Sequence, residues 1–336
     1  MTTSVTDPLI SVVIPNYNGE MCLPVCLNSL LEQSYRNLEI VVADNGSSDR
    51  SVHVLEANYP NVHLIKLSVN RGFSAAVNAG IQRVLGEFVV ILNNDTRAER
   101  EFIRELYNAL RDEHSAAMAA PKMLFARDHT IINSVGLGYS ITGSNHDIGF
   151  GVKDAPQFAS RNWVFGPCGG AGMFRRSVFE DVGPLDEDFF MYYEDVDYSF
   201  RAQLLGYKCI FAPTARVYHE EGASGGFLPK SRNYFFARNS FAVIVRDFPS
   251  RLIFKYAHTI SWEIAKRTLS PLLKGDVSAV LGLCAAMGRL ASTLKKRRVT
   301  QAHRRVPDSY IESILLRNRS VVKEIDLRGR PVEGVS

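Results

Sequence analysis

The chain has 336 residues, enough for one large domain or two ordinary ones. Its 46% apolar content and mean hydropathy of −0.06 are typical of a globular protein. A net charge of +4 is too small to indicate nucleic-acid binding by itself. No basic segment followed by an apolar core opens the chain, and no run of about 18 apolar residues occurs. We therefore expect a cytoplasmic protein without a secretory signal or a conventional transmembrane helix.

The cysteines are odd in number and scattered: Cys22, Cys26, Cys168, Cys209 and Cys284. The spacing of Cys22 and Cys26 suggests a metal clip, but no second Cys or His pair follows at zinc spacing. We expect buried, reduced thiols instead.

Short apolar segments at 9–15, 38–44, 62–67 and 87–95 are rich in Val and Ile and too short for helices. The apolar spacing between them predicts helices near 20–33, with Pro24 in the first turn, and near 73–85, with Gly86 as the stop. Continuous apolar strands that alternate with helices predict an α/β fold with a mostly parallel, Rossmann-like sheet, flanked by helices.

Polar residues cluster where three of these predicted strands end. The clusters are Pro15, Asn16 and Asn18; Asp44 to Asp49; and Asn93, Asn94 and Asp95. Ligands of open α/β sheets bind outside the carboxyl ends of the strands, so the three clusters together predict one site. Taken singly, the segment DNGSSD would also suit a turn with a helix cap.

The two commonest nucleotide-binding motifs are absent, because neither G-x-G-x-x-G nor G-x-x-x-x-G-K-[ST] follows the first strand. A nucleotide held by acids and a metal ion remains. Asp44 can accept hydrogen bonds from a base or ribose, and Asp95 can bind a hard divalent cation that neutralises a diphosphate.

The stretches VVIPNYNG, VVADNGSSD, NRGFSAAVNAGI and VILNNDT resemble, in this order, the donor half of family-2 glycosyltransferases of the GT-A fold. The resemblance continues through GPCGGAGMFRRSVFEDVG and FFMYYEDVDYSFRAQLLGYK and covers about residues 9–240, with most similarity to the bacterial rhamnosyltransferase-like branch. It implies base binding by Asp44 and metal binding by a D-x-D motif that reads Asn93-Asn94-Asp95 here, so only the last acid is present. The donor-binding residues that we infer are Pro15, Asn16, Asn18, Asp44, Arg71, Asn78, Asn93, Asn94 and Asp95.

The segment 166–176 is rich in glycine, which lets backbone approach a ligand closely but equally suits a tight connection. The resemblance places it beneath the donor sugar and near the acceptor. We assign Gly169, Gly170, Glu194 and Trp163 to the sugar and acceptor.

Glu194, Asp195 and Asp197 place three acids within four residues at the start of a predicted helix. Neighbouring carboxylates repel, so one of them is expected to have the raised pKa that a general base requires. Asp195 would equally suit a helix cap. The resemblance assigns the base to Asp195, and we expect Asp197 to pair with Arg201, one turn further on.

His219 follows a strand-like segment, and a lone histidine is usually structural. The resemblance implies that His219 completes a site for Mg²⁺ or Mn²⁺ with Asp95. Arg232 and Arg238 are candidates for the diphosphate, although a solvated cationic face explains them nearly as well.

We expect a catalytic domain at 1–245, with nucleotide-sugar binding at 9–100 and the acceptor part at 101–245, and a helical, basic region at 246–336. Residues 277–307 contain no acid but seven cations: Arg289, Lys295, Lys296, Arg297, Arg298, Arg304 and Arg305. An apolar helix beside such a cluster suits an anionic membrane surface. A helical cap or a homodimer interface is the alternative, and nucleic acid is not expected because no recognised module accompanies the cluster.

These features predict an inverting, metal-dependent transfer of a sugar from a nucleotide diphosphate to a hydroxyl of a glycan or lipid-linked acceptor. The resemblance favours dTDP-rhamnose, cell-envelope polysaccharide synthesis and a peripheral position on the inner face of the cell membrane. A non-catalytic nucleotide-sugar- or glycan-binding module is one alternative, but it would not need the acids at 194–197. A nucleotidyltransferase is another, but the first strand lacks its basic glycine-rich loop.

Overall fold

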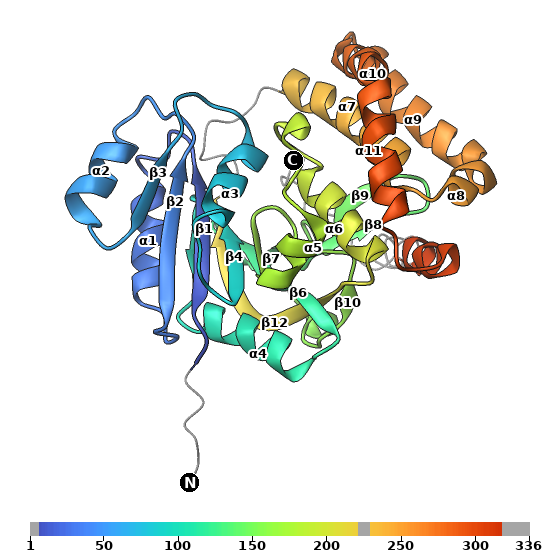
Figure 1. Ribbon diagram of the computed structural model, residues 1–336. Helices are drawn as coiled ribbons and strands as arrows, with labels where there is room; N and C mark the ends of the chain where they lie inside the picture. Colours follow the sequence, from blue (N-terminus) through green and yellow to red (C-terminus); the bar gives the residue numbers. More distant parts are fainter. Residues whose placement is uncertain (1–6, 221–228, 318–336) are drawn as a thin grey trace.

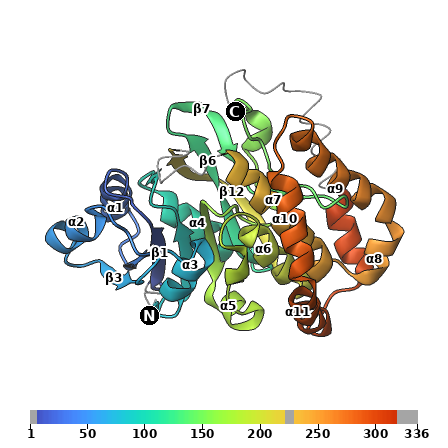
Figure 2. The same cartoon turned by 90° about the horizontal axis from the view of Figure 1, so that it is seen from above.

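The computed structural model describes residues 7–220 and 229–317 (Figure 1). One mixed sheet runs through the first two thirds of the chain in the order β10-β12-β6-β11-β4-β1-β2-β3, with β5 beside β12 and β7 beside β6. Helices flank this sheet, and a group of helices follows it at one side of the molecule (Figures 1 and 2). The predicted α/β fold with a helical C-terminal region is confirmed.

The parallel part of the sheet comes from the first hundred residues. Its strands are β1 (Ile10–Asn16), β2 (Leu38–Asp44), β3 (His63–Lys66) and β4 (Phe88–Leu92), and its helices are α1 (Leu23–Leu31), α2 (Ser51–Asn58) and α3 (Phe73–Ile81). β1 pairs with both β2 and β4 in parallel, and the register sets Asn16 opposite Asp44. Burial of both faces explains the continuous Val and Ile runs.

Pro24 lies in the first turn of α1, as predicted. The predicted helix at 73–85 is wrong at its end, because α3 stops at Ile81 and Gly86 does not cap it. A Cβ on Gly86 would lie 2.4 Å from the Ser11 hydroxyl and 2.7 Å from the Ser11 nitrogen. Gly86 is therefore explained by its close approach to β1 rather than by a helix end.

The antiparallel strand β11 joins the two parts of the sheet. The second part contains β5 (Thr96–Ala98), α4 (Phe102–Asp112), β6 (Ala116–Phe125), β7 (Asp128–Ser134), β10 (Trp163–Val164), β11 (Ala171–Arg175), α5 (Arg176–Val182), α6 (Glu194–Leu204) and β12 (Lys208–His219); β8 (Leu137–Tyr139) pairs separately with β9 (Asn145–Asp147). β11 runs antiparallel to β4 and to β6. The glycine-rich loop before β11 therefore lies at the carboxyl end of β4.

The C-terminal helices are α7 (Pro229–Asp247), α8 (Ser250–Lys255), α9 (Ala257–Leu272), α10 (Ser278–Gly288) and α11 (Leu290–Ala302). Their apolar side chains share a core with α6, where Phe200 contacts Phe248 of the segment after α7. The expected boundary at 245/246 falls in the last turn of α7, and the division there stays a prediction. No helix among the described residues is both long and apolar enough to cross a bilayer.

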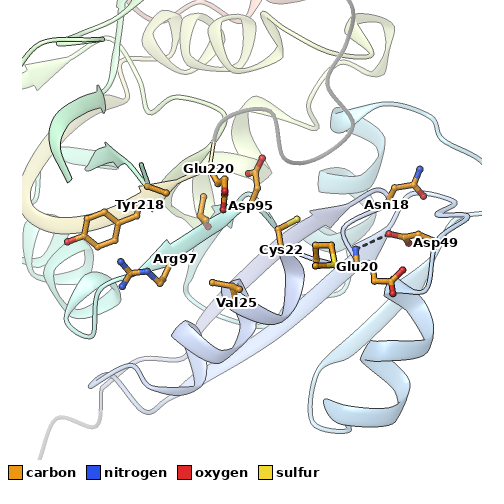
Figure 3. Close-up of a pocket in the computed structure, with 12 residues that line it drawn as sticks. Asn18, Glu20, Cys22, Val25, Asp49, Asp95, Arg97, Tyr218 and Glu220 are labelled. Atoms are coloured by element: carbon orange, nitrogen blue, oxygen red, sulfur yellow. Dashed lines mark hydrogen bonds between the residues drawn. The ribbon is translucent and has the colours of Figure 1, made fainter. Parts of the chain in front are cut away.

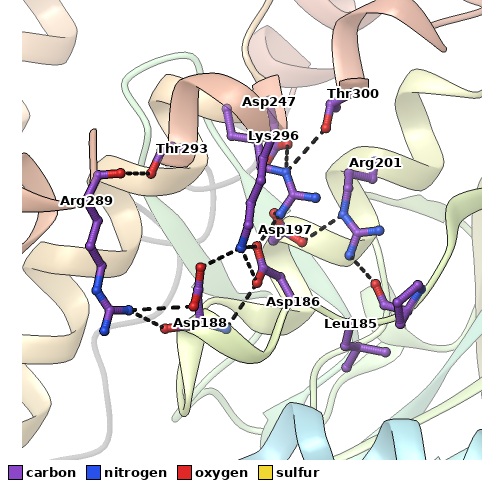
Figure 4. A network of polar contacts seen from close by, with 12 residues as sticks. Leu185, Asp186, Asp188, Asp197, Arg201, Asp247, Arg289, Thr293, Lys296 and Thr300 are labelled. Atoms are coloured by element: carbon purple, nitrogen blue, oxygen red, sulfur yellow. Dashed lines mark hydrogen bonds and ion pairs between the residues drawn. The ribbon is translucent and has the colours of Figure 1, made fainter. Parts of the chain in front are cut away.

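A polar network links α6, α7 and α11 (Figure 4). The predicted pair is present and buried, with Arg201 Nε 2.8 Å from Asp197 Oδ2. Arg246 of α7 bridges the other Asp197 oxygen at 2.9 Å and Asp186 at 2.7 Å. Lys296 of α11 reaches Asp186 and Asp188, each at 2.6 Å.

Most cations of the basic cluster in the tail are therefore paired with other groups of the chain, so the cluster is not a free cationic surface. Besides Lys296, its paired members are Arg289 with Asp188, Arg297 with the Val245 and Phe248 carbonyls, Arg304 with Asp308 and Arg305 with Asp181. Lys295 and Arg298 are exposed. All five cysteines are free thiols; Cys26 and Cys209 are buried as expected, whereas Cys284 is exposed.

Candidate active site

Amide side chains join the ends of β4, β1 and β2. Asn94 Nδ2 donates to Asn16 Oδ1 at 2.7 Å, and Asn16 Nδ2 donates to Asp44 Oδ1 at 2.8 Å. A Cβ on Gly19 would lie 2.2 Å from the Asn16 amide oxygen and 2.4 Å from the Asn94 amide nitrogen. Glycine at position 19 thus leaves room for this chain of hydrogen bonds, which holds the predicted clusters at one edge of the sheet.

Asp44 is buried and accepts further hydrogen bonds from Ser47, at 2.6 Å from the hydroxyl and 3.0 Å from the backbone N–H. Asn18 lies beside this turn, because its backbone N–H donates to Ser47 Oγ and its side chain accepts from the Ser48 N–H. The carboxylate of Asp44 therefore fixes the turn after β2. Direct base binding by Asp44 stays a prediction.

Asp95 and His219 come together because β5 and β12 pair. The register sets His219 opposite Thr96, and the Glu220 N–H donates to the Asp95 carbonyl at 2.9 Å. His219 Nε2 lies 3.3 Å from Asp95 Oδ1, while its Nδ1 lies 3.1 Å from Asn133 Oδ1 on β7. With Nδ1 donating to that oxygen, Nε2 offers its lone pair on the side of Asp95.

This pair fits a divalent cation in its donor chemistry. With this tautomer, the Asp95 carboxylate oxygen and His219 Nε2 are two electron donors 3.3 Å apart, and both can bind one divalent cation. No group of three His, Cys, Asp or Glu suited to a metal occurs in the described part of the chain. A cation held by these two side chains would take its other ligands from water and substrate phosphates.

A cavity of about 370 Å³ opens beside Asp95 (Figure 3). Its lining includes Asn18, Glu20, Cys22, Asp49, Asp95 and Glu220, so residues after β1, β2, β4 and β12 face one space. Burial, together with the charge of Asp95, raises the pKa of Cys22 to about 11. The thiol stays protonated at neutral pH and is a poor nucleophile.

The glycine-rich loop connects Asp195 to the end of β4. The Gly169 N–H donates to Asp195 Oδ2 at 2.8 Å, and the Asn93 N–H donates to the Gly170 carbonyl at 2.9 Å. Gly169 and Gly170 thus lie between Asp195 and the segment that carries Asp95. Of the two glycines predicted to contact the sugar, Gly169 therefore lies against Asp195 and Gly170 against Asn93.

The turn before Asp195 has an unusual backbone. Phe190, Tyr192 and Tyr193 have φ values of 62°, 65° and 70°, which side chains larger than glycine rarely adopt. Asn239 of α7 holds this turn, because its Nδ2 lies 3.1, 2.8 and 2.7 Å from the carbonyl oxygens of Phe189, Met191 and Tyr192. The backbone conformation of this turn sets the direction in which α6 begins and so the position of Asp195.

Arg238 serves the same turn rather than standing free for a diphosphate. Its Nη2 donates to the carbonyls of Asp188 and Phe189, at 2.9 and 2.6 Å, and its side chain is buried. These contacts give Arg238 a structural role, and diphosphate binding by Arg238 stays a prediction. Arg232, one and a half turns earlier on α7, is exposed with its guanidinium 5.1 Å from the centre of the Phe236 ring.

Glu194 and Asp195 compete for one proton. Burial, together with the adjacent Asp195 charge, raises the pKa of Glu194 to about 8. Burial also raises the pKa of Asp195, but N–H groups of Gly169 and Val196 stabilise its ionised form. At neutral pH we place the proton on Glu194 and the negative charge on Asp195.

Three of the predicted ligand-binding residues, Asn78, Arg71 and Trp163, do not line the cavity beside Asp95. Asn78 pairs with the backbone of Leu185, donating and accepting at 2.9 Å, so it holds a loop. Arg71 forms an exposed ion pair with Glu187 at 2.7 Å. Trp163 pairs with Ile210, at the opposite end of β12 from His219, and lines a different cavity with Lys208 and Tyr310. Assignment of Trp163 to the sugar site is therefore not supported by its position.

Sequence reasoning missed three residues that support the site. Asn133 orients His219, Asn239 holds the strained turn, and Arg267 of α9 donates to the Tyr193 hydroxyl at 2.5 Å. Each is distant in sequence from the residue it supports and belongs to no chemical motif. Only the packing of β7, α7 and α9 reveals them.

Comparison with known proteins now adds to this geometry. The model of glycosyl transferase family 2 matches residues 11–183, about half of the chain. The chain belongs to glycosyl transferase family 2. It is 27% identical over 254 residues to the N-acetylglucosaminyl-diphospho-decaprenol L-rhamnosyltransferase of Mycobacterium tuberculosis, covering 67% of this chain and 80% of that protein. It is 28% identical over 208 residues to the low-salt glycan biosynthesis hexosyltransferase Agl10 of Haloferax volcanii, covering 58% of this chain and 61% of that one.

Solved structures of other proteins share the fold. TarS 1–349 of S. aureus, solved with UDP, superposes with a TM-score of 0.56 at 17% identity, over 96% of this chain and 92% of that one. The mannosyltransferase PcManGT of Pyrobaculum calidifontis, solved with GDP-Man and Mn²⁺, gives 0.53 at 18% identity, over 96% and 88%. The family match and the curated relatives confirm the predicted glycosyltransferase class. The solved structures confirm the predicted GT-A fold.

Proposed function

We propose that this glycosyltransferase moves a sugar, with inversion, from a nucleotide diphosphate to an acceptor hydroxyl. The observation that carries the proposal is the path from Asp195 through Gly169 and Gly170 to Asn93, which joins a carboxylate of raised pKa to the segment that carries Asp95. A single displacement requires a general base and a diphosphate-binding group in one site, and these hydrogen bonds connect the two elements that carry them.

Asp195 is the base in this proposal. Its carboxylate accepts the proton of the acceptor hydroxyl while the acceptor oxygen attacks the anomeric carbon, and the bond from that carbon to the diphosphate oxygen breaks. The protonated Glu194 beside it leaves one negative charge on the pair at neutral pH. No enzyme nucleophile is needed for this single displacement.

Asp95 and His219 would hold a divalent cation, Mg²⁺ or Mn²⁺, and the PcManGT structure contains Mn²⁺ together with its nucleotide sugar. When bound, such a cation would neutralise charge on the departing diphosphate. Asn133 keeps the His219 ring in place for this role. Asn18 and the turn held by Asp44 border the same space and are the proposed nucleotide side.

For the substrates, we propose dTDP-rhamnose as donor and a glycan or lipid-linked acceptor of the cell envelope, at the inner face of the membrane. The support is the similarity to the mycobacterial rhamnosyltransferase, whose name specifies a diphospho-decaprenol acceptor. TarS and PcManGT have been solved with UDP-GlcNAc and GDP-Man, so the fold itself does not select the sugar.

The test combines a panel of nucleotide sugars with three proteins: the wild type, Asp195→Asn and Asp197→Asn. Loss of a general base typically costs about 10² to 10⁴ in rate. Asp195→Asn should lose turnover by that factor and keep its donor affinity, whereas Asp197→Asn should lose stability through its Arg201 and Arg246 contacts. Near-normal turnover of Asp195→Asn on the preferred donor would refute the base assignment.

The same panel tests the metal. Excess chelator should abolish transfer, and Mg²⁺ or Mn²⁺ should restore it. Asp95→Ala should lose binding of both the cation and the donor while its far-ultraviolet circular dichroism stays that of the wild type. Full activity in excess chelator would contradict the proposed role of Asp95 and His219.

A further inference from the structure

The outer face of α8 and α9 exposes large apolar side chains. Trp262 is 73% exposed, Phe254 80% and Leu273 87%. Single exposed apolar residues are common, but several large ones on one face indicate an interaction surface. Both views place α8 and α9 at the side of the molecule opposite α2 (Figures 1 and 2).

The spacing on α9 shows that this exposure is a continuous face. Trp262, Lys266, Leu269 and Leu273 follow each other at i, i+4, i+7 and i+11, so they lie on one side of the helix. The opposite side carries the buried Ile260 and the half-buried Ile264 and Arg267, which pack toward the core. The helix is thus amphipathic in the described structure, and its outer side has no covering element.

The exposed charges that α8 and α9 contribute to this face are all positive. Arg251, Lys266 and Lys274 are exposed, and Lys255 is exposed beside Glu312. Between residues 248 and 275 the only acid is Glu263, which is half-buried and pairs with Arg267 at 3.0 Å. A surface of Trp, Phe and Leu ringed by Lys and Arg complements the interfacial region of an anionic bilayer.

We propose that the exposed side chains of Phe254, Trp262, Lys266, Leu269 and Leu273, together called the α8–α9 face, dock on an anionic lipid surface. We assign membrane contact to this face rather than to the basic cluster of residues 289–305, because most cations of that cluster are paired with other groups of the chain. The inference rests on the proposed function in one respect, the presentation of a lipid-linked acceptor.

The link to the active site supports this choice of partner over another protein. Arg267, on the inner side of α9, donates to the Tyr193 hydroxyl at 2.5 Å, and Tyr193 lies two residues before Asp195. An α-helix with its side chains is about 10–12 Å across. One helix therefore carries the docking face on one side and touches the turn of the base on the other, which would bring a membrane-anchored hydroxyl toward Asp195.

Tryptophan fluorescence can test the proposal directly, because the protein contains only Trp163 and Trp262. In a Trp163→Phe background, Trp262 emission should shift to the blue on adding phosphatidylglycerol vesicles, and brominated lipid should quench it. Vesicles of phosphatidylcholine alone should bind much less protein. An unchanged Trp262 emission with anionic vesicles would overturn the proposal.

Matched variants then separate this face from the other candidate surfaces. The double variant Lys266→Glu and Lys274→Glu should weaken vesicle partitioning by at least about 30-fold. Each cation lost near the surface is expected to weaken partitioning about five-fold. Lys295→Glu with Arg298→Glu, and Leu85→Ser, remove exposed charges or an exposed leucine elsewhere and should bind as the wild type. Selective loss in the Lys295 and Arg298 variant would return the role to the tail cluster.

Donor hydrolysis in the absence of lipid distinguishes failure of this inference from failure of the proposed function. The Lys266 and Lys274 variant should hydrolyse donor at the wild-type rate, so vesicle binding can fail while chemistry persists. The mass of the protein in solution completes the test. If the wild type is a dimer and Trp262→Ala is a monomer, the α8–α9 face binds a second copy of the chain. That result would overturn the lipid assignment.

Discussion

Two adjacent carboxyl groups with unequal surroundings support the proposal that Asp195 is the base while Glu194 holds the proton. Glu194 is buried and has a pKa of about 8, whereas Asp195 is half-buried and receives N–H groups from Gly169 and Val196. Such a difference in environment is how one site keeps an acid neutral beside an ionised partner. The pair, rather than either residue alone, sets the pH range of activity.

This assignment predicts how stability depends on pH. The pKa of Glu194 rises from its ordinary value of 4.5 to about 8 on folding, so the folded protein binds the proton more tightly. The free energy of unfolding should therefore fall as pH rises from about 4.5 to about 8. Glu194→Gln carries no such proton, and its stability relative to the wild type should increase across this range, by at most about 1.4 kcal/mol per pH unit.

Urea unfolding at pH 5, 6, 7 and 8 would measure this difference. Glu180→Gln is the matched control, because Glu180 is exposed on α5 and should leave the pH dependence of the wild type intact. Parallel pH profiles for the wild type and Glu194→Gln would show that Glu194 ionises normally in the folded protein.

At the scale of elements, α7 holds the turn that precedes Asp195. Asn239 binds three carbonyls of a segment in which three residues have positive φ. A strained backbone persists only where its surroundings hold it. Asn239 thus acts on Asp195 through the turn, as a positioning residue rather than a catalytic one.

Asn239→Ala should release this turn and lower turnover at least about ten-fold, since a small misplacement of a reacting group is costly. Donor affinity should stay unchanged, and the pH profile of turnover should shift as the Gly169 contact with Asp195 loosens. Asn233→Ala is the control, because Asn233 lies on the same helix but bonds to Asp276 at 2.8 Å. A stability loss with an unshifted pH profile would indicate a purely structural role.

The elements also show what the sequence could predict. The parallel strands and the clusters after them were predictable, because burial on both faces requires Val and Ile runs and the polar residues break those runs at one edge. The Asp197–Arg201 pair followed from helical spacing alone. The structural contacts of Arg238, Asn133 and Asn239 could not be predicted, because their partners are backbone carbonyls or side chains brought near only by tertiary packing.

At the scale of the whole molecule, the helical region and the sheet behave as one packed unit in the described structure. Phe200 of α6 and Phe248 share a core with Leu252 and Ile260, and Arg246 joins Asp186, Asp197 and Asp247 across the junction. Removing the chain after about residue 275 would strip α10 and α11 from α7. Such a deletion would therefore test folding rather than membrane contact.

Arg246→Gln should destabilise both parts of the molecule together. Asp197 and Asp247 are fully buried, and loss of a buried cationic partner costs about 3–5 kcal/mol. Trp163 lies on β10 and Trp262 on α9. The Trp262→Phe variant therefore reports unfolding of the sheet through Trp163, and the Trp163→Phe variant reports unfolding of the helices through Trp262. Their urea midpoints should coincide and should move down equally with Arg246→Gln. Arg298→Gln, at an exposed site, should shift the free energy of unfolding by no more than about 0.5 kcal/mol. Separate midpoints for the two reporters would show instead that the helical region unfolds on its own.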